Sequence, residues 1–236
     1  MIVGEGGVLM SGVGIHKTFR GPAGELEILR GINLDIAKGY MCFIGGRSGA
    51  GKSTLLHILA ALDRPTQGAV HFRGKDLAKA GEKEISRYRN EKMGFIFQFY
   101  HLLPELTVLE NVCLPALMAK RKNQRTKALG LLQKMGLEER ALHLPSQLSG
   151  GEKQRAAIAR SLINDPEIVF CDEPTGNLDD ETAEHVFQVI MDLNRRDGQT
   201  FCIVTHEESL VASGKHVYHL HEGRLALKRA APLEKD

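Results

Sequence analysis

The stretch MCFIGGRSGAGKSTLLHIL, residues 41–59, decides the fold of this chain. It opens with a short apolar run at residues 41–44, which predicts a buried strand, and continues into a glycine-rich loop. Apolar residues then recur at helical spacing after Lys52, which predicts a helix that begins near this lysine. In a strand, loop and helix arranged in this order, backbone N–H groups and a helix N-terminus can surround a phosphate group. The stretch therefore predicts an α/β fold with a phosphate-binding loop.

The loop matches the pattern GxxxxGK[ST], whose residue types share the work of holding a nucleotide triphosphate. Lys52 is expected to reach the β- and γ-phosphates, and Ser53 to place a hydroxyl group on Mg²⁺. The glycines let backbone N–H groups turn inward around the phosphate oxygens. We therefore expect ATP and Mg²⁺ as ligands. The nucleotide-binding residues predicted here are Gly46, Arg47, Ser48, Gly49, Ala50, Gly51, Lys52, Ser53 and Thr54.

Two further apolar runs, residues 168–171 and 201–205, also predict strands, and each is followed by reactive side chains. Asp172 is expected to hold Mg²⁺, and Glu173 to orient or deprotonate the attacking water. His206 is expected to contact the γ-phosphate. Parallel strands place their ligand-binding loops at their carboxyl ends, so the loops after the three strands are expected to converge. Glu173, His206 and Lys52 are thus the predicted catalytic residues.

The rest of the chain alternates short apolar runs with helical stretches, which is typical of an α/β domain with a mainly parallel sheet. The middle of the chain is helical instead, most clearly at residues 127–135 and 152–163, with no strong strand between residues 98 and 161. We expect one domain over residues 1–236, with a helical lobe at about residues 98–164 inserted into the α/β core.

The sequence LSGGE, residues 148–152, predicts a second anion site. Ser149 and Glu152 have the spacing of a capping box at a helix start. Gly150 and Gly151 leave N–H groups open there, and a helix N-terminus attracts anions. A bound nucleotide needs a single such helix end, and the phosphate loop already has one. The second site is therefore expected to serve the nucleotide of another molecule.

Composition and charge exclude several classes of protein. The 236 residues are 42% hydrophobic and 25% charged, which fits one globular domain. A net charge of +2 from 31 basic and 29 acidic residues lacks the basic excess of nucleic-acid binders, so we expect no nucleic-acid partner. The short basic stretch at residues 120–127 is interpreted as a solvated face. No apolar stretch reaches the roughly 18 residues of a membrane helix, and the first residues do not look like a secretory signal. We therefore expect a cytoplasmic protein without direct membrane insertion.

Cysteine and histidine usage gives no sign of a disulfide framework or of a separate metal site. Cys42, Cys113, Cys171 and Cys202 are far apart, form no CxxC pair and are interpreted as reduced structural thiols. A histidine cluster near the end of the chain raises the alternative of a metal site. Strand alternation, however, predicts that its first member, His216, faces away from the later pair, so this alternative is disfavoured. The later pair is His219 and His221.

The chain resembles the ATP-binding cassette (ABC) ATPases over nearly its whole length. The motifs that carry the resemblance are Phe19, the phosphate loop, Gln98, LSGGEKQ, CDEPTGNLD and THE, in the family's order and approximate spacing. The resemblance implies a P-loop NTPase with a RecA-like core at about residues 1–97 and 165–236, an antiparallel β subdomain and the inserted helical subdomain. It also implies that Phe19 stacks on adenine, that Gln98 links Mg²⁺ to the helical lobe, and that Asp179 communicates between two sites.

The same resemblance implies how two copies assemble. The segment of Ser149, Gly150, Gly151 and Glu152 would contribute to the nucleotide site of the partner, with the first three binding its γ-phosphate. Two composite sites would then form in a head-to-tail dimer. The metal ligands implied for each site are Ser53, Gln98 and Asp172.

Within the family, EPTGNLD at residues 173–179 and GFIFQFYHLLPELTVLENV at residues 94–112 look most like the lipoprotein-releasing LolD group. This implies a peripheral ATPase on the cytoplasmic face of the inner membrane, with permease subunits of the LolC/LolE kind as partners. The tyrosine, histidine and leucine after Gln98 would line the groove that receives the permease. Two related interpretations stay open: MacB-like drug or peptide efflux, and FtsE-like regulation of cell division. A soluble ATPase of translation or DNA repair is disfavoured, because those usually carry paired cassettes or a long coiled coil.

Three residues depart from the family pattern. Arg47 stands where proline is frequent, Tyr40 replaces the usual acid, and Phe19 replaces the commoner tyrosine. None of these departures removes a catalytic group.

Overall fold

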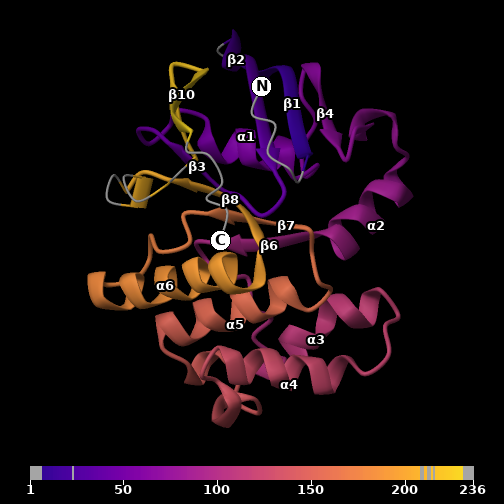
Figure 1. Ribbon diagram of the computed structural model, residues 1–236, viewed down its shortest axis with the longest axis vertical. Coiled ribbons are helices and arrows are strands. Elements are labelled where there is room, and N and C mark those ends of the chain that lie inside the picture. The colour runs from indigo at the N-terminus through magenta and orange to yellow at the C-terminus, as the bar shows by residue number, and fades with distance from the viewer. Residues whose placement is uncertain (1–6, 23, 208–209, 212–213, 215, 231–236) are drawn as a thin grey trace. The chain divides into compact units, whose positions relative to one another are not determined.

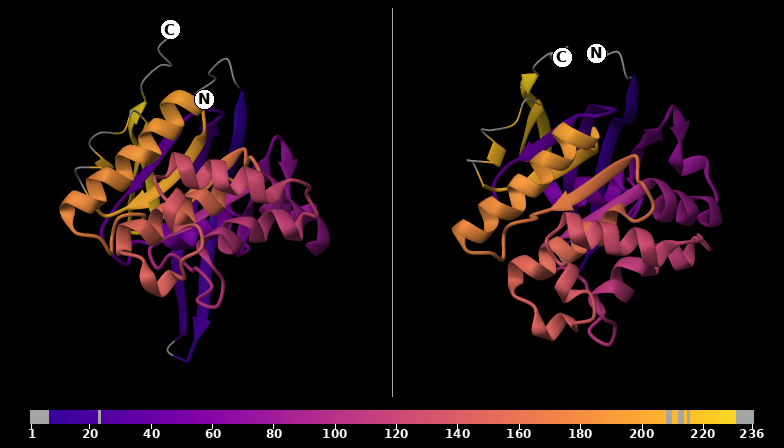
Figure 2. Two further views of the ribbon diagram at one scale, coloured as in Figure 1. Left: turned by 90° about the horizontal axis from the view of Figure 1, so that it is seen from below. Right: turned by 60° about the horizontal axis from the view of Figure 1, so that its bottom comes forward.

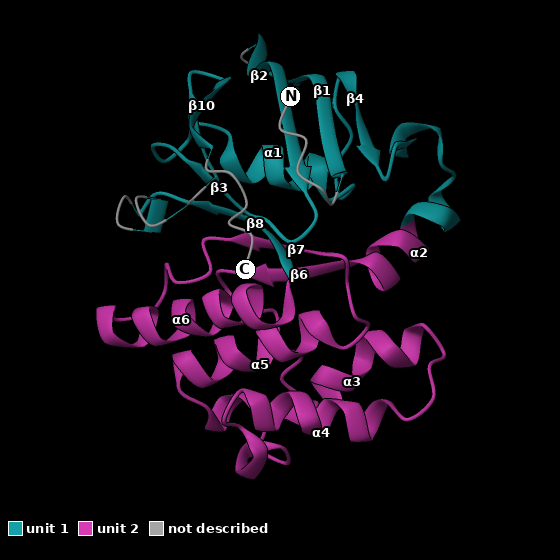
Figure 3. Cartoon of the chain, viewed as in Figure 1, with its two compact units in different colours: residues 1–85, 199–236 teal, residues 86–198 magenta. Residues whose placement is uncertain are grey.

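The computed structural model describes residues 7–22, 24–207, 210–211, 214 and 216–230. The chain divides into two compact units, shown in different colours in Figure 3. Unit 1 consists of Met1–Ile85 and Gln199–Asp236, and unit 2 of Ser86–Gly198. The tail expected after residue 230 lies outside the described residues.

Unit 1 contains an antiparallel sheet with the strand order β2-β1-β4-β5 (Figure 1). Strands β1 (Val8–Gly21) and β2 (Gly24–Ala37) form a long hairpin, in which Phe19 pairs with Leu26. Strand β4 (Gln67–Phe72) pairs with β1, and the short β5 (Lys75–Asp76) pairs with β4. The antiparallel β subdomain implied by the family resemblance is therefore present.

The second sheet of unit 1 carries the phosphate loop. Its strands run in the order β10-β9-β3-β8, and their bounds are β3 (Met41–Gly45), β8 (Thr200–Thr205), β9 (His216–His221) and β10 (Arg224–Ala230). Strand β3 is parallel to both β8 and β9. Helix α1 (Lys52–Leu59) follows β3 and buries the apolar face predicted for it. The strands predicted at residues 41–44 and 201–205 are thus confirmed to within one residue.

Unit 2 combines a parallel strand pair with a group of helices. Strands β6 (Met93–Phe97) and β7 (Ile168–Asp172) pair in parallel, with Phe97 opposite Asp172. The helices α3 (Val108–Met118), α4 (Gln124–Lys134) and α5 (Gly150–Leu162) pack on one another, as Figures 1 and 2 show, and α5 also packs on α6 (Asp180–Asp197). Residues 98–161, all of which the structure describes, contain no strand, as predicted.

Short elements connect these parts. Helix α2 (Glu82–Lys92) follows the 3₁₀ turn η1 (Leu77–Lys79). Two more 3₁₀ turns, η2 (Glu138–Arg140) and η3 (Pro145–Gln147), lead from α4 to α5. No helix within the described part of the chain is long and apolar enough to cross a membrane.

The cysteines are free and buried as predicted, and His216 faces away from His219 and His221 as predicted. All four cysteines are free and buried. His216 stacks on Tyr40, the residue that replaces the acid usual in the family. The ring centroids are 4.0 Å apart, and both side chains are buried. His219 and His221 stack on each other instead, with centroids 6.4 Å apart. The first histidine therefore packs into the core, and its ring is not grouped with the other two.

Candidate functional site

The phosphate loop is a tight connection between β3 and α1, and Gly51 makes it possible. This residue caps α1 with a φ of 97°, a left-handed conformation that side chains rarely tolerate. A Cβ atom on Gly51 would also lie 2.7 Å from Cγ2 of Ile28. The loop can therefore close against β2 only with glycine at this position.

Lys52 lies inside the loop in the position expected for a phosphate-binding group. Its side chain is buried, and its Nζ atom donates hydrogen bonds to the carbonyl oxygens of Gly46 at 3.0 Å and Arg47 at 3.3 Å. The ammonium group is thus held within the curve of the loop. A triphosphate that enters the loop can displace these carbonyl oxygens, because its full negative charge attracts the ammonium more strongly than a carbonyl dipole does.

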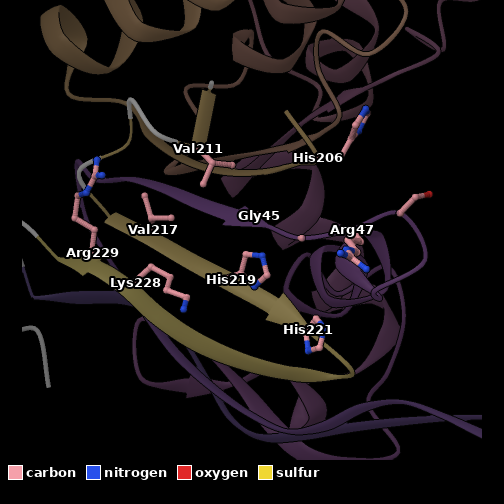
Figure 4. Close-up of a pocket in the computed structure, with 11 residues that line it drawn as sticks. Gly45, Arg47, His206, Val211, Val217, His219, His221, Lys228 and Arg229 are labelled. Atoms are coloured by element: carbon pink, nitrogen blue, oxygen red, sulfur yellow. The ribbon is translucent and has the colours of Figure 1, made fainter. Parts of the chain in front are cut away.

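His206 begins the loop beside the phosphate loop. Strands β3 and β8 are parallel, and Gly45 pairs with Thr205, so that the residues after these two open adjacent loops. His206 and residues 45–48 line one cavity of about 870 Å³ (Figure 4). Of the three strand ends expected to converge, the structure brings together these two. Asp172 and Glu173 belong to unit 2, and their approach to the phosphate loop stays a prediction.

The cavity has a basic wall that was not predicted from the sequence. Strands β9 and β10 contribute His219, His221, Lys228 and Arg229, and Figure 4 shows the two histidines on the strand beside the phosphate loop. Among the described residues that line the cavity there is no carboxylate. The wall favours an anion such as a phosphate. Only the pairing of β9 with β3 reveals this, because the histidines lie far from residue 46 in the sequence.

In unit 2, the structure places Gln98 beside the two acids. Because Phe97 pairs with Asp172, both Gln98 and Glu173 follow their strands at the same end of the parallel pair. Nε2 of Gln98 donates to Oδ1 of Asn177 at 3.0 Å, and Nδ2 of Asn177 donates back to the Gln98 carbonyl oxygen at 2.9 Å. Asn177 was not predicted as a site residue, and it fastens Gln98 to the loop that follows Glu173.

Glu173 has an unusual backbone conformation. Its φ of 47° places it in the left-handed region, which costs a residue with a side chain roughly 1–2 kcal/mol. Strain of this kind persists only where the surrounding structure enforces it, and it is concentrated at functional sites. The catalytic role of this carboxylate stays a prediction.

The capping box predicted at LSGGE is present. The Ser149 hydroxyl accepts from the Glu152 N–H at 3.2 Å, and the Glu152 carboxylate accepts from the Ser149 N–H at 2.8 Å. The hydrogen bond from the Ser149 N–H, aided by Arg140, holds the pKa of Glu152 below its usual value despite partial burial. A Cβ atom on Gly151 would lie 2.4 Å from Cγ2 of Thr182, so this glycine allows α5 to pack closely on α6. Gly150 lies at the same helix start.

The remaining predicted residues lie in separate places. Phe19 is 46% exposed on β1, as a stacking platform for a base requires. Asp179 caps α6 and accepts a hydrogen bond from the Thr182 N–H at 3.0 Å, which lowers the pKa of its carboxyl group. Ala50 and Thr54 flank Lys52 and Ser53 at the start of α1. The role of Asp179 in communication between sites stays a prediction.

The chemistry of the residues predicted to bind Mg²⁺ suits that ion. Ser53, Gln98 and Asp172 carry hydroxyl, amide and carboxylate oxygens, which are the ligands that Mg²⁺ prefers. Ser53 belongs to unit 1 and the other two to unit 2, so that a common metal site for the three stays a prediction. Within the described ranges, no three His, Cys, Asp or Glu side chains form a group that could hold a metal ion. Mg²⁺ in nucleotide sites needs only one or two carboxylates, because phosphates and water complete its coordination.

Comparison with known proteins assigns the family. Residues 29–176 match the family model for the ABC transporter domain. The chain belongs to the ABC transporter family. It is 47% identical over 214 residues to the lipoprotein-releasing system ATP-binding protein LolD of Bacteroides fragilis, covering 90% of this chain and 97% of that protein. The protein of the same name from Cytophaga hutchinsonii is 51% identical over 198 residues, covering 83% and 89%.

Solved structures agree with this assignment. The dimeric structure of MJ0796, a bacterial ABC transporter cassette, superimposes with a TM-score of 0.85 at 37% identity and covers 96% of this chain and 100% of its own. A dimeric post-hydrolysis state of the same cassette bound to ADP and Pi gives a TM-score of 0.84 with the same identity and coverage. The chain is therefore a nucleotide-binding ABC transporter ATPase. The predicted family, fold class and activity are confirmed, and the dimeric relatives agree with the predicted homodimer.

Proposed function

We propose that this ABC ATPase supplies the energy for releasing lipoproteins from the inner membrane. Two copies would close on two ATP molecules, and closure would drive conformational change in a membrane permease. The proposal is supported by similarity to lipoprotein-releasing LolD proteins from several bacteria, which extends over most of this chain.

The proposal that two copies share each nucleotide site rests on one observation, which is that the chain has two helix starts suited to phosphate. Helix α1 begins at the phosphate loop in unit 1, and α5 begins at Ser149 in unit 2. A triphosphate in the loop already has the N-terminus of α1. The start of α5 is therefore assigned to the triphosphate of the partner, where Ser149, Gly150 and Gly151 present hydroxyl and N–H donors.

The chemistry assigned to the site is hydrolysis of the γ-phosphate. Lys52 leaves the carbonyl oxygens of its loop and binds the β- and γ-phosphates. Glu173 accepts a proton from water as the water oxygen attacks the γ-phosphorus, while the bond from phosphorus to the departing ADP oxygen breaks. His206 holds the γ-phosphate in place. Ser53, Gln98 and Asp172 would hold Mg²⁺, which neutralises charge on the phosphates.

Unit 2 has a surface that suits a permease as partner. In the loop after β6, Phe99 is 69% and Leu103 43% exposed, and at the end of α3 Met118 is 69% exposed. Exposed apolar side chains that lie together in one loop, as Phe99 and Leu103 do, are the kind of surface that a protein partner covers. With Tyr100 and His101 in the same loop, they support docking of a LolC/LolE-like permease segment. The chain would then be peripheral on the cytoplasmic face of the membrane.

The base is tested with Glu173→Gln. The amide cannot accept the proton of the attacking water, so the variant is expected to bind ATP and dimerise but to turn over at least about 100-fold more slowly. Glu184→Gln, an exposed position on α6, is the matched control and should keep the wild-type rate. Wild-type turnover by Glu173→Gln, measured as phosphate release, would show that another group is the base.

The shared site is tested by mixing two inactive variants, Lys52→Ala and Ser149→Arg. Random pairing makes half of the dimers mixed, and each mixed dimer has one intact site, so the mixture should recover about a quarter of the wild-type rate. Each variant alone should be nearly inactive while remaining folded in thermal unfolding. Full turnover by strictly monomeric wild-type protein would contradict the proposal.

The transported substrate needs its own test. The chain should co-purify with a permease from detergent-solubilised membranes, and the reconstituted complex should release a lipoprotein from vesicles when ATP is added. A complex that hydrolyses ATP but leaves the lipoprotein in the vesicle would contradict lipoprotein release and leave the ATPase assignment intact. Recovery with a permease for drugs or a cell-division partner would favour the related interpretations instead.

A further inference from the structure

One face of the Phe19 ring is occupied by a cation from its own strand. The Nζ atom of Lys17 lies 5.0 Å from the centroid of the Phe19 ring, within the range of a cation–π interaction. Both residues belong to β1, and both lie in unit 1. Across the hairpin, Leu26 pairs with Phe19 and is 62% exposed.

Lys17 is fixed by bonds to the segment that follows α1. Its ammonium group forms an ion pair with the Asp63 carboxylate, at 2.7 Å and 2.8 Å to the two oxygens, and donates to the Arg64 carbonyl oxygen at 2.8 Å. The Lys17 side chain is only 12% exposed. Partial burial raises the pKa of Asp63, but hydrogen bonds from Lys17 and the Arg64 N–H outweigh it and lower the pKa overall. The ammonium therefore has a defined position over the ring.

We propose that Lys17 is a positioning residue for the adenine base of the nucleotide. The proposal rests on the proposed function in one respect, which is that Phe19 is the platform for the base. With the ammonium on one face of the ring, the base can stack only on the opposite face. A phenylalanine has no hydroxyl group to anchor its ring, and here the lysine takes over that task. A ring already held in its binding orientation loses less conformational freedom when the base arrives.

A purely structural role is the alternative, because Lys17 also ties β1 to the segment after α1. The two roles differ in which ligand they affect. A positioning role concerns the base alone, whereas a structural role would disturb every ligand of the site. Inorganic tripolyphosphate carries the phosphates of ATP without the base and separates the two.

The experiment measures the dissociation constants of ATP and of tripolyphosphate by calorimetry on the full chain. Lys17→Met keeps the length of the side chain but removes its charge, and it should weaken ATP binding about three- to tenfold while changing tripolyphosphate binding less than about twofold. Lys17→Arg should retain most of the ATP affinity. Arg20→Met removes a charge from the same strand, where Arg20 pairs with the exposed Glu25, and should change neither constant.

A double-mutant cycle with Phe19→Ala completes the test. In that background Lys17→Met should have no further effect on ATP binding. An equal loss of ATP and tripolyphosphate affinity in Lys17→Met would show a structural role and overturn the inference. The inference also fails if Phe19→Ala weakens ATP binding but Lys17→Met does not. If Phe19→Ala leaves ATP binding unchanged, the platform assignment itself fails, which is a failure of the proposed function.

Discussion

Replacement of Arg160 by methionine is predicted to release the loop that follows β6. The Arg160 guanidinium, on α5, donates one hydrogen bond to the Tyr100 carbonyl oxygen at 2.6 Å and another to the His101 carbonyl oxygen. Both of these loop residues have left-handed backbones, with φ values of 60° and 49°. The Arg160 guanidinium is partly removed from water, and this burial lowers its pKa. The Arg160 side chain thus holds the conformation of the loop.

The magnitude follows from these two bonds. A hydrogen bond to a charged group contributes about 1.5–3 kcal/mol, and water will partly replace the lost partners because the loop is near the surface. We therefore expect the loop to lose about 2–4 kcal/mol of local stability. The left-handed residues add to the effect, since each gains roughly 1–2 kcal/mol when it relaxes.

Hydrogen exchange of the amides at residues 99–103 is the assay. A loss of 2–4 kcal/mol corresponds to roughly 30- to 1000-fold faster exchange there, while amides of α1 should be unaffected. Arg160→Lys keeps the charge but cannot donate both hydrogen bonds in the same geometry. Its exchange rate at residues 99–103 should lie between those of the wild type and of Arg160→Met. Basal ATP turnover should change little, whereas stimulation by a permease should be lost. Unchanged exchange at residues 99–103 in Arg160→Met would refute the reasoning.

Two further predictions concern the phosphate sites. Lys52→Ala should weaken ATP binding by at least about tenfold, because it removes the buried ammonium of the phosphate loop, and unaltered binding in calorimetry would contradict the phosphate-loop assignment. Glu152→Gln should reduce the free energy of unfolding at pH 7, because the folded-state pKa of Glu152 is lowered and its carboxylate contributes its full stabilisation above the unfolded pKa of about 4.3. The difference from wild type should therefore shrink as the pH falls through the lower folded pKa, and a difference independent of pH in urea unfolding would contradict the cap.

Local signals made the phosphate loop predictable from the sequence. An apolar run, closely spaced glycines and a helical pattern lie within residues 41–59, so strand, loop and helix could each be placed to within about one residue. Helix α4 begins at Gln124, three residues before the predicted start. Its N-cap, Asn123, has a left-handed backbone and makes no side-chain capping bond. The side-chain capping bond that usually fixes a helix start is therefore absent at this asparagine.

Contacts between distant residues could not be predicted in this way. Lys17 and Asp63 are 46 positions apart, and Arg160 and Tyr100 are 60 apart. No periodicity links such pairs, since they meet only after strands and helices have packed. His219 and His221 of the basic wall were not predicted for the same reason, because only strand pairing places them beside the phosphate loop.

The two helix starts assigned to phosphate differ in charge, and this difference predicts an order of events. Helix α1 begins without a side-chain cap and without an acid in its first turn, so its positive end is available to a triphosphate. Helix α5 begins with Ser149 as a cap and with the Glu152 carboxylate already accepting a backbone N–H. That carboxylate offsets part of the attraction for a second anion. ATP should therefore bind the phosphate loop first, with an affinity independent of protein concentration. The start of α5 would follow only when a partner presents a bound triphosphate, so that dimer formation depends on nucleotide.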